Sequence, residues 1–353
     1  MNLDELRTKI DSLDERILSL LAERARLAAA IAKLKQKDNA TQFVPSRERQ
    51  ILERIVSLNP GPLSAESVAA IYEQIIAACR ALESPLNIAY LGPAGTFCHL
   101  AAKRKFGPDA TLLPFSSIDD VFMAVEKKNA NFGVVPVENS IAGVERSTLD
   151  RFIGSVVHIC AECYVDIRHN LLQRDPREET KRVYSHPQAL AQCHNWLRAN
   201  LPGVETIEVS STARAAQLAA AEPGLAAIGT ELAASLYNLP IVASGIQDRP
   251  DNRTRFLIIG QEDAQPSGKD KTSLMFSVLH RAGSLWEALG IFHRNKINMT
   301  MIESRPTKQT PWEYVFFADV QGHNHEEPLS TALAELAQQI LFVKVLGSYP
   351  EAE

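Results

Sequence analysis

Basic residues near the N-terminus stand on helical segments whose apolar stripe is otherwise unbroken, where their side chains could bind carboxylates. Arg24 and Lys35 lie eleven positions apart, so at about 100° per residue they point within about 20° of one face. Arg7 lies seventeen positions before Arg24, about 25 Å along a helix axis, and points elsewhere. The alternative is a solvated charged face. One chain cannot bring Arg7 to the face of Arg24, whereas an antiparallel partner helix could.

Polar clusters follow three strand-like runs further along the chain. Residues 138–140 (Glu-Asn-Ser) follow a buried run, Ser185 lies in YSHPQ with Gln192 one turn later, and Thr254 lies in NRTRF. Open α/β sheets bind ligands beyond the carboxyl ends of their strands. Each cluster alone also fits capping and turn chemistry. Together they indicate three strand ends that could face one cleft.

A glycine-rich turn, GPAGTF at 92–97, joins a predicted strand to a predicted helix and contains Thr96. Its spacing matches neither a Walker A motif nor G-x-G-x-x-G, which argues against a nucleotide. A carboxylate bound at the helix N-terminus is the functional interpretation, and a tight structural turn is the alternative.

The elements that must position these residues change character twice along the chain. Apolar steps of three and four from Leu3 to Leu34 predict one helix of roughly 48 Å, which needs a second chain to cover its stripe. Helices are predicted at 47–58 and 64–82, the latter capped by Ser64. From Asn87 to about 262, strands alternate with helices, including one at 187–199, in two α/β lobes. A polar linker at 260–271 precedes the β-α-β-β-α-β order of a ferredoxin-like domain.

The composition of the chain limits the classes of function that it can have. The 353 residues carry a formal charge of −5, which argues against a nucleic-acid partner, and no apolar run approaches the ~20 residues that cross a bilayer. The five cysteines have no framework spacing, and Cys160 and Cys163 fall on opposite faces of a strand-like run. We therefore expect buried free thiols, a cytoplasmic location, and neither a metal nor a cofactor.

The first 84 residues resemble the all-helical chorismate mutase family, through LRTKIDSLDERILSLLAERARLAAAIAKLK and SRERQILERI. The resemblance implies an intertwined dimer that rearranges chorismate to prephenate, which requires positioning of a dicarboxylate and stabilisation of charge on the breaking ether oxygen. It places Arg7 in the neighbouring chain's site and makes Glu48 the partner of a substrate hydroxyl. Arg24, Lys35 and Arg47 would come from the same chain, with Lys35 donating to the ether oxygen.

Two positions depart from the mutase pattern. Glu83 stands where some members carry glutamine as a second donor to the ether oxygen, so it must be protonated to act. We expect mutase activity to fall as pH rises and to fall less in Glu83→Gln. Val44 stands where some members carry an acidic residue, which leaves Glu48 alone on the hydroxyl.

Residues 87–262 resemble prephenate dehydratase, through GPAGTF, VVPVENS, YSHPQA and TRF in family order. The resemblance implies two lobes, like a periplasmic-binding-protein clamshell, with prephenate between them. It makes Thr254 the catalytic residue, which polarises the leaving hydroxyl, and Glu138 a candidate acid if it is buried. Asn139, Ser185 and Gln192 would position the substrate, with Thr96 and Ser140 near its carboxylates.

Residues 272–353 resemble the ACT domain of these enzymes, through Gly283-Ser284-Leu285 and Glu303-Ser304-Arg305-Pro306. The resemblance implies L-phenylalanine bound at an ACT dimer interface, in a homodimer or homotetramer. A plain ferredoxin-like packing module is the alternative.

Taken together, the sequence predicts a multidomain α plus α/β enzyme that makes phenylpyruvate from chorismate and is inhibited by phenylalanine. Three alternatives stay open. The helical module could serve dimerisation alone, the whole chain could be a non-catalytic amino-acid sensor, or arogenate could replace prephenate.

Overall fold

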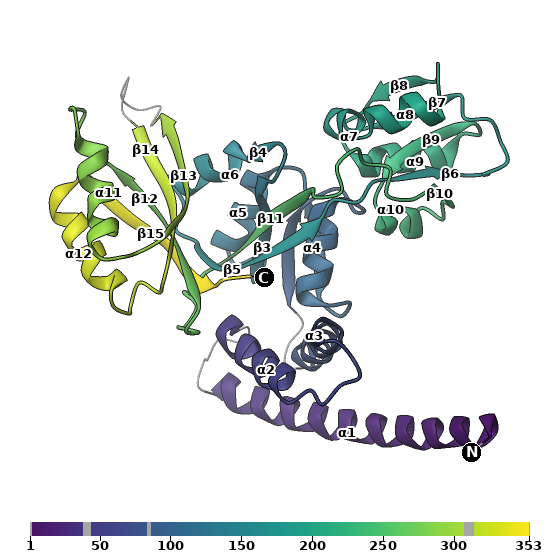
Figure 1. Cartoon of the computed structure of the whole chain (residues 1–353), viewed down its shortest axis with the longest axis horizontal. Coiled ribbons are helices and arrows are strands. Elements are labelled where there is room, and N and C mark those ends of the chain that lie inside the picture. The colour runs from purple at the N-terminus through teal and green to yellow at the C-terminus, as the bar shows by residue number, and fades with distance from the viewer. Residues whose placement is uncertain (1, 38–43, 83–85, 307–313, 353) are drawn as a thin grey trace. The chain divides into compact units, whose positions relative to one another are not determined.

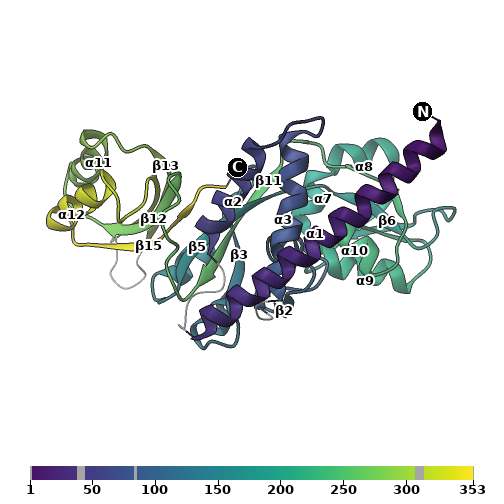
Figure 2. The same cartoon turned by 90° about the horizontal axis from the view of Figure 1, so that it is seen from below.

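The computed structural model describes residues 2–37, 44–82, 86–306 and 314–352, with the backbone alone at 35–37. The chain forms two compact units, residues 1–86 with 106–111 and residues 87–105 with 112–353. Each is described by itself. Figures 1 and 2 show the elements of both units. Among the described helices, none is long and apolar enough to cross a membrane.

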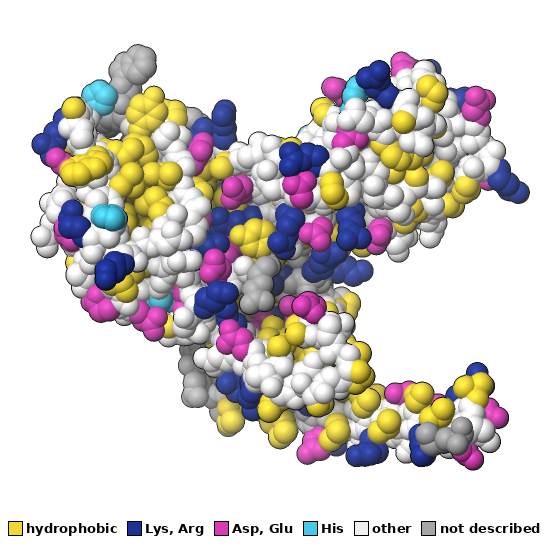
Figure 3. All heavy atoms as spheres, in the orientation of Figure 1, with side chains coloured by type: hydrophobic (Ala, Val, Ile, Leu, Met, Phe, Trp, Pro, Cys, Tyr) yellow, Lys and Arg dark blue, Asp and Glu magenta, His cyan; other side chains and the backbone are white. Residues whose placement is uncertain are grey.

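The first unit is helical: α1 (Leu3–Lys37), α2 (Pro45–Ser57) and α3 (Ala65–Ala81). The predicted single long helix is confirmed, and the Ser64 hydroxyl caps α3 by accepting a hydrogen bond from the Ser67 amide at 3.2 Å. The apolar stripe of α1 is largely uncovered, with Leu3, Ile17, Leu20 and Leu34 each more than half exposed. Figure 3 shows this row of hydrophobic side chains along the helix.

The first lobe of the second unit is a sheet in the order β2-β1-β3-β11-β5, with β4 paired to β3. β1 runs parallel to β3, whereas β11 is antiparallel to both of its neighbours. The elements of this lobe are β1 (Asn87–Leu91), α4 (Phe97–Phe106), β2 (Thr111–Phe115), α5 (Ile118–Glu126), β3 (Phe132–Asn139), β4 (Gly143–Val144), α6 (Arg146–Phe152), β5 (His158–Asp166) and β11 (Arg253–Gly260).

The second lobe is a separate five-stranded sheet in the order β10-β6-β9-β7-β8. The chain enters it after β5 and leaves it before β11, so two crossovers at 167–169 and 244–252 join the lobes. The crossovers are paired, since the Ile167 amide donates to the Asn252 carbonyl at 2.8 Å. The elements are β6 (Asn170–Gln173), β7 (Arg182–Ser185), α7 (Pro187–Gln192), α8 (His194–Asn200), β8 (Glu205–Glu208), α9 (Thr212–Ala221), β9 (Leu225–Gly229), α10 (Glu231–Leu236) and β10 (Ile241–Ala243).

The expected single helix at 187–199 is wrong, because α7 and α8 break at Cys193. The Asp248 amide donates to the Gln192 carbonyl at 2.7 Å, and the Asp248 carboxylate accepts from the amides of Asn195 and Trp196. A residue from the second crossover therefore ends the first helix and caps the second. A cap supplied from more than fifty residues away leaves no local signal in the sequence.

The C-terminal domain has the predicted ferredoxin-like order. It comprises β12 (Asp270–Ser277), α11 (Ser284–Arg294), β13 (Met299–Pro306), β14 (Tyr314–Gln321), α12 (Leu329–Gln339) and β15 (Phe342–Pro350), with an antiparallel sheet ordered β13-β14-β12-β15.

Both faces of this C-terminal sheet are covered. Leu274 and Phe276 pack with α11 and α12, whereas Met275 between them belongs to the core of the first lobe. Strand β15 passes so close to β5 that a Cβ at Gly347 would collide with the Ile159 backbone. The C-terminal domain and the first lobe therefore share one core.

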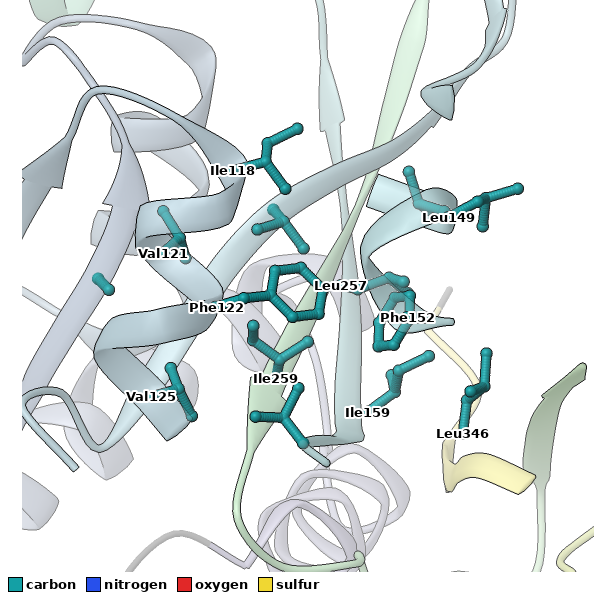
Figure 4. Close-up of a cluster of buried hydrophobic side chains, with 14 of the residues drawn as sticks. Ile118, Val121, Phe122, Val125, Leu149, Phe152, Ile159, Leu257, Ile259 and Leu346 are labelled. Atoms are coloured by element: carbon teal, nitrogen blue, oxygen red, sulfur yellow. The ribbon is translucent and has the colours of Figure 1, made fainter. Parts of the chain in front are cut away.

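That shared core is built around two phenylalanine rings. Phe122 of α5 and Phe152 of α6 meet edge to face, with centroids 5.0 Å apart. Figure 4 shows them among side chains of α5, α6, β5 and β11, with Leu346 of β15 beside them. The core thus anchors β11, the strand that carries Thr254.

Candidate active sites

The helical unit contains a pocket of about 340 Å³ lined by all three helices. Arg24 comes from α1, Arg47 and Glu48 from α2, and Arg80 from α3, with Val44 at the start of α2. Three of the predicted residues, Arg24, Arg47 and Glu48, are therefore brought together. Three guanidinium groups facing one carboxylate give the pocket an excess of positive charge, which suits an anionic ligand.

Arg80 is the residue of this pocket that sequence reasoning missed. Its side chain is 5% exposed, pairs with Glu48, and lies over the Phe106 ring at 5.5 Å from its centroid. No local signal pointed to Arg80, because its pairing with Glu48, 32 positions earlier in the chain, depends on how α2 and α3 pack together. Arg80 forms an ion pair with the Glu48 carboxylate, which is the group that was expected to hold a substrate hydroxyl.

Three predicted mutase residues are not among the described residues that line this pocket. Arg7 is exposed near the far end of α1 and lies 3.6 Å from Asp4, so within one chain it does not line the pocket. Lys35 belongs to the last turn of α1, but its side chain lies outside the described part of the chain. Glu83 lies outside the described residues altogether.

Thr254 lies directly opposite Asn139, where β11 pairs with β3. The Asn139 Nδ2 donates to Thr254 Oγ1 at 2.8 Å and to Asn252 Oδ1 at 2.7 Å. Asn139 Oδ1 accepts from the backbone amides of Ile141 and Ala142, which fixes which way the amide points. The Thr254 oxygen is thus an acceptor here, so its own hydrogen can point to another group.

Ser140 ties the loop after β3 to the start of β11. Its hydroxyl donates to the Asp251 carbonyl at 3.2 Å and accepts from the Arg253 amide at 2.9 Å. Asn139 and Ser140 are therefore hydrogen-bonded to residues 251–254, more than a hundred positions later in the chain, in one cluster. Ser140 makes backbone contacts within this cluster.

Glu138 is opposite Arg255, and its Oε2 lies 3.9 Å from the Arg255 guanidinium. Its side chain is 42% exposed, so the burial expected of a carboxylic acid held in its protonated form is not found. Glu138 is therefore placed beside the cluster as a solvated carboxylate near a buried cation.

Arg255 points from β11 away from Thr254 and into a buried ionic network that joins the first lobe to the C-terminal domain. Its Nε donates to Glu162 at 2.6 Å, and its two terminal nitrogens donate to Asp319 at 2.5 Å and Tyr349 at 2.9 Å. Lys271 completes the network through Glu162 at 2.9 Å. Burial raises the pKa of Tyr349 well above its ordinary value, so its hydroxyl stays neutral.

The glycine-rich turn is held between the lobes. Thr230 of the second lobe donates to the Gly95 carbonyl at 2.7 Å, and Tyr237 donates to the Ala94 carbonyl at 3.2 Å. Gly95 has φ +96°, which favours glycine, and a Cβ there would lie 3.2 Å from Ala233. The Thr96 hydroxyl donates to the Pro93 carbonyl of its own turn at 3.1 Å, so in this conformation it stabilises the turn.

Gln192 and Ser185 take different positions in the second lobe. Gln192 Oε1 accepts from His169 Nε2 at 2.8 Å, and the His169 ring meets Phe97 of the first lobe edge to face at 5.5 Å. Burial lowers the pKa of His169, which keeps the imidazole neutral. Ser185 is fully buried, and its hydroxyl donates to the Ile228 carbonyl at 2.8 Å within the sheet.

In the C-terminal domain, the two predicted effector motifs differ in what they contact. Gly283, at φ +88°, caps α11, and the buried Ser284 hydroxyl has no hydrogen-bond partner. Leu285 packs against the core of this domain. Residues 303–306 lie on β13, and there Arg305 makes two hydrogen bonds, of 2.8 and 3.1 Å, to the carboxylate of Asp150 on α6.

Comparisons with known proteins cover the whole chain. The family model of chorismate mutase type II matches residues 6–84. The family model of prephenate dehydratase matches residues 88–264, and that of the ACT domain matches residues 272–338. The bifunctional chorismate mutase/prephenate dehydratase of Aquifex aeolicus is 49% identical over 355 residues, covering 99% of this chain and 98% of its own.

Two solved structures are similar to three quarters of the chain. One is the prephenate dehydratase of Arthrobacter aurescens in complex with L-Phe, with 33% identity and a TM-score of 0.70, covering 75% of this chain and 90% of that one. The other, GqqA, is described as a novel type of quorum-quenching acylase, with 29% identity and a TM-score of 0.69, covering 75% and 97%.

Proposed function

Because the chain belongs to the bifunctional chorismate mutase/prephenate dehydratase family, we propose that it converts chorismate to prephenate and prephenate to phenylpyruvate, with L-phenylalanine as feedback inhibitor. One fold can host unrelated activities, as the similarity to a described acylase illustrates, so the assignment rests on the sites as well. The three regions are 1–84 for the mutase, 87–262 for the dehydratase and 272–353 for the ACT domain.

The observation that carries the dehydratase assignment is the hydrogen bond from Asn139 to Thr254. In dehydration, the ring carboxylate leaves as CO₂, the electron pair of the broken bond enters the ring, and the 4-hydroxyl departs as water with a proton taken from solvent. A donor to that hydroxyl lowers the barrier. Since Thr254 already accepts from Asn139, its own O–H is available to donate to the leaving oxygen.

The residues around this pair bind and orient prephenate in our proposal. Gln192, with its oxygen held by His169, presents its amide N–H groups to the substrate. Ser140 and Thr96 lie in the loops at the lobe junction and would donate to the two carboxylates when substrate displaces their present contacts. The buried Ser185 supports the sheet below the site rather than touching substrate.

For the mutase, the pocket of Arg24, Arg47 and Arg80 binds the two carboxylates of chorismate. The reaction needs no nucleophile and no proton transfer, so clamping the substrate in its reactive shape is the main contribution of the protein. Lys35 donates to the ether oxygen, and Glu83, in its protonated form, supplies a second donor. Glu48 is held by Arg80 and orients the substrate hydroxyl.

The uncovered stripe of α1 supports a homodimer in which two long helices pack together and each supplies Arg7 to the other chain's pocket. The 25 Å that separate Arg7 from Arg24 along one helix make a second chain necessary for this contact. A homotetramer would arise if the ACT domains also pair. We place the enzyme in the cytoplasm, where the buried thiols of Cys98 and Cys160 stay reduced.

For regulation, we propose that phenylalanine binds at the ACT domain between Gly283-Ser284-Leu285 and residues 303–306; the similar prephenate dehydratase of Arthrobacter aurescens was solved in complex with L-Phe. The unpartnered Ser284 hydroxyl is one group that a ligand could engage. Arg305 is engaged by Asp150, so it would link the effector site to the dehydratase rather than hold the effector's carboxylate. Inhibition requires that phenylalanine bind one conformation better than the other.

The test is to incubate the pure full-length chain with chorismate, with prephenate and with arogenate, each with and without phenylalanine. We expect phenylpyruvate from chorismate and from prephenate, suppressed by phenylalanine, and little turnover of arogenate. If phenylpyruvate forms from prephenate but not from chorismate, the helical unit serves dimerisation alone. If no substrate gives a product, the chain is a non-catalytic sensor and the proposal is refuted.

A further inference from the structure

Among the residues that the structure describes, three buried side-chain polar atoms have no hydrogen-bond partner: His169 Nδ1, Asn252 Nδ2 and Ser284 Oγ. Burying an amide donor without a partner is unfavourable, so such a group persists where something other than stability maintains it. Asn252 lies two residues before Thr254 and is 1% exposed. It is not among the residues assigned a role above.

The orientation of the Asn252 amide follows from its neighbour. Asn139 Oδ1 is taken by the amides of Ile141 and Ala142, at 3.1 and 2.8 Å, so Asn139 must turn its Nδ2 toward Asn252. Asn252 can then only present its Oδ1, at 2.7 Å, because the reverse orientation would set two NH₂ groups against each other. This orientation leaves the Asn252 Nδ2 unpartnered.

Three acceptors surround the Asn139 NH₂ group: Asn252 Oδ1 at 2.7 Å, Thr254 Oγ1 at 2.8 Å and, at a longer 3.2 Å, the Arg253 carbonyl. An amide group held by an acceptor on one hydrogen has its other hydrogen fixed in direction, since the group is planar. The backbone of Asn252 is itself fixed, because its carbonyl accepts from Ile167 across the paired crossovers. A relay therefore runs from the crossovers through Asn252 and Asn139 to the Thr254 oxygen.

We propose that Asn252 is a positioning residue for the dehydration, which acts through Asn139 to keep the Thr254 oxygen occupied as an acceptor and its hydrogen directed to the leaving hydroxyl. The inference rests on the proposed dehydratase function. Without Asn252, the Asn139 Nδ2 loses its shortest contact, so its hydrogens can shift toward the Arg253 carbonyl and Thr254 can rotate to donate to the protein instead of to the substrate. The ground-state complex changes little, so the effect falls on kcat more than on KM.

The decisive variant is Asn252→Leu in the full-length chain, assayed with prephenate. Leucine fills a similar volume and removes the unpartnered donor together with the acceptor, so we expect thermal stability close to that of the wild type. We expect kcat to fall about tenfold or more, with KM within about threefold, corresponding to the loss of one hydrogen bond in the transition state. A merely structural role predicts a loss of stability and unchanged kcat in the folded fraction.

Asn170→Leu is the matched control. Asn170 is also 1% exposed and close to a crossover, but both ends of its amide are satisfied, by the Gly229 carbonyl and the Gly245 amide. Its replacement removes the hydrogen bonds that its amide makes with the buried Gly229 carbonyl and the Gly245 amide. We expect that variant to melt at a lower temperature while retaining wild-type kcat below its melting point, the opposite of Asn252→Leu.

A double-mutant cycle with Asn139→Ala tests whether Asn252 acts through Asn139. We expect Asn139→Ala/Asn252→Leu to be no slower than Asn139→Ala alone. Multiplicative losses in kcat, or an Asn252→Leu enzyme as fast as wild type, would overturn the inference while leaving the dehydratase assignment intact. A wild-type chain that does not turn over prephenate would overturn both.

Discussion

Replacing Arg255 with methionine is expected to destabilise the dehydratase and ACT domains together. Arg255 is 5% exposed and is the cation that Glu162, Asp319 and Tyr349 share. In the variant, Glu162 keeps its hydrogen bond from Lys271 at 2.9 Å. Among the described residues, the Asp319 carboxylate keeps only the side-chain hydrogen bond from Ser273, at 2.5 Å. A nearly fully buried carboxylate is then left without a cation.

The size of the effect follows from that uncompensated charge. Breaking a buried ion pair by removing one partner typically costs about 3–5 kcal/mol, most of it from the charge left behind. With a denaturant slope of about 3 kcal/mol per M urea for a protein of this size, the transition midpoint should fall by about 1 to 1.7 M. Neutralising the stranded carboxylate in Arg255→Met/Asp319→Asn should restore roughly half of the loss.

Urea titrations followed by far-UV circular dichroism would measure the unfolding transition of each variant. Arg253→Met is the matched control, since Arg253 is on the same strand with its side chain half exposed and lies 3.2 Å from Asp166. An exposed pair of this kind contributes about 0–1 kcal/mol. If Arg255→Met loses no more stability than Arg253→Met, or if Asp319→Asn restores nothing, the reasoning about stranded charge is wrong.

Three further predictions concern the mutase, regulation and pH. Arg80→Met should lower mutase kcat/KM by about 100-fold or more while prephenate turnover by the same chain stays unchanged; parallel losses would contradict a local role. Asp150→Asn, which breaks the paired hydrogen bonds to Arg305, should leave uninhibited dehydratase activity intact, leave phenylalanine binding by calorimetry within a few fold, and weaken inhibition at saturating phenylalanine; unchanged inhibition would refute the link. His158 Nδ1 donates to the Asp263 carboxylate at 2.8 Å, which raises the pKa of His158 above its ordinary 6.5 and lowers that of Asp263 below its ordinary 3.8. The pair should therefore stabilise the fold most between about pH 4 and 6.5 and lose effect as pH rises through the raised His158 pKa, by under about 1 kcal/mol because both groups are a third exposed; a difference between wild type and Asp263→Asn that grows above pH 7 would contradict this.

Local periodicity was enough to predict the architecture. The steps of three and four in α1, the strand–helix alternation after Asn87 and the final β-α-β-β-α-β order are confirmed by the structure. These patterns indicate which face of an element is buried, and they depend only on residues that are close together in the sequence. The break between α7 and α8 was not predicted, because the cap comes from Asp248, far along the chain.

The sites were partly predictable for the same reason. The motifs around Asn139 and Thr254 could be located, since strand ends are marked by the switch from apolar to polar residues. The partners of these residues could not, because Asn252, Arg80 and the ACT residues of the Arg255 network are defined by antiparallel register and domain packing. Ser185 was expected at a substrate and is buried in its sheet.

The enclosure of the C-terminal sheet on both faces limits how the proposed feedback control by phenylalanine could be lost. A gene shortened after residue 262 would encode a catalytic fragment in which the apolar side chains that pack against Leu346 are exposed to water. In that fragment Arg255 would also lack its hydrogen bonds to Asp319 and Tyr349. Such a fragment would aggregate or be degraded before it could overproduce phenylpyruvate. Strains selected for overproduction should therefore carry point substitutions in the sensing domain far more often than truncations.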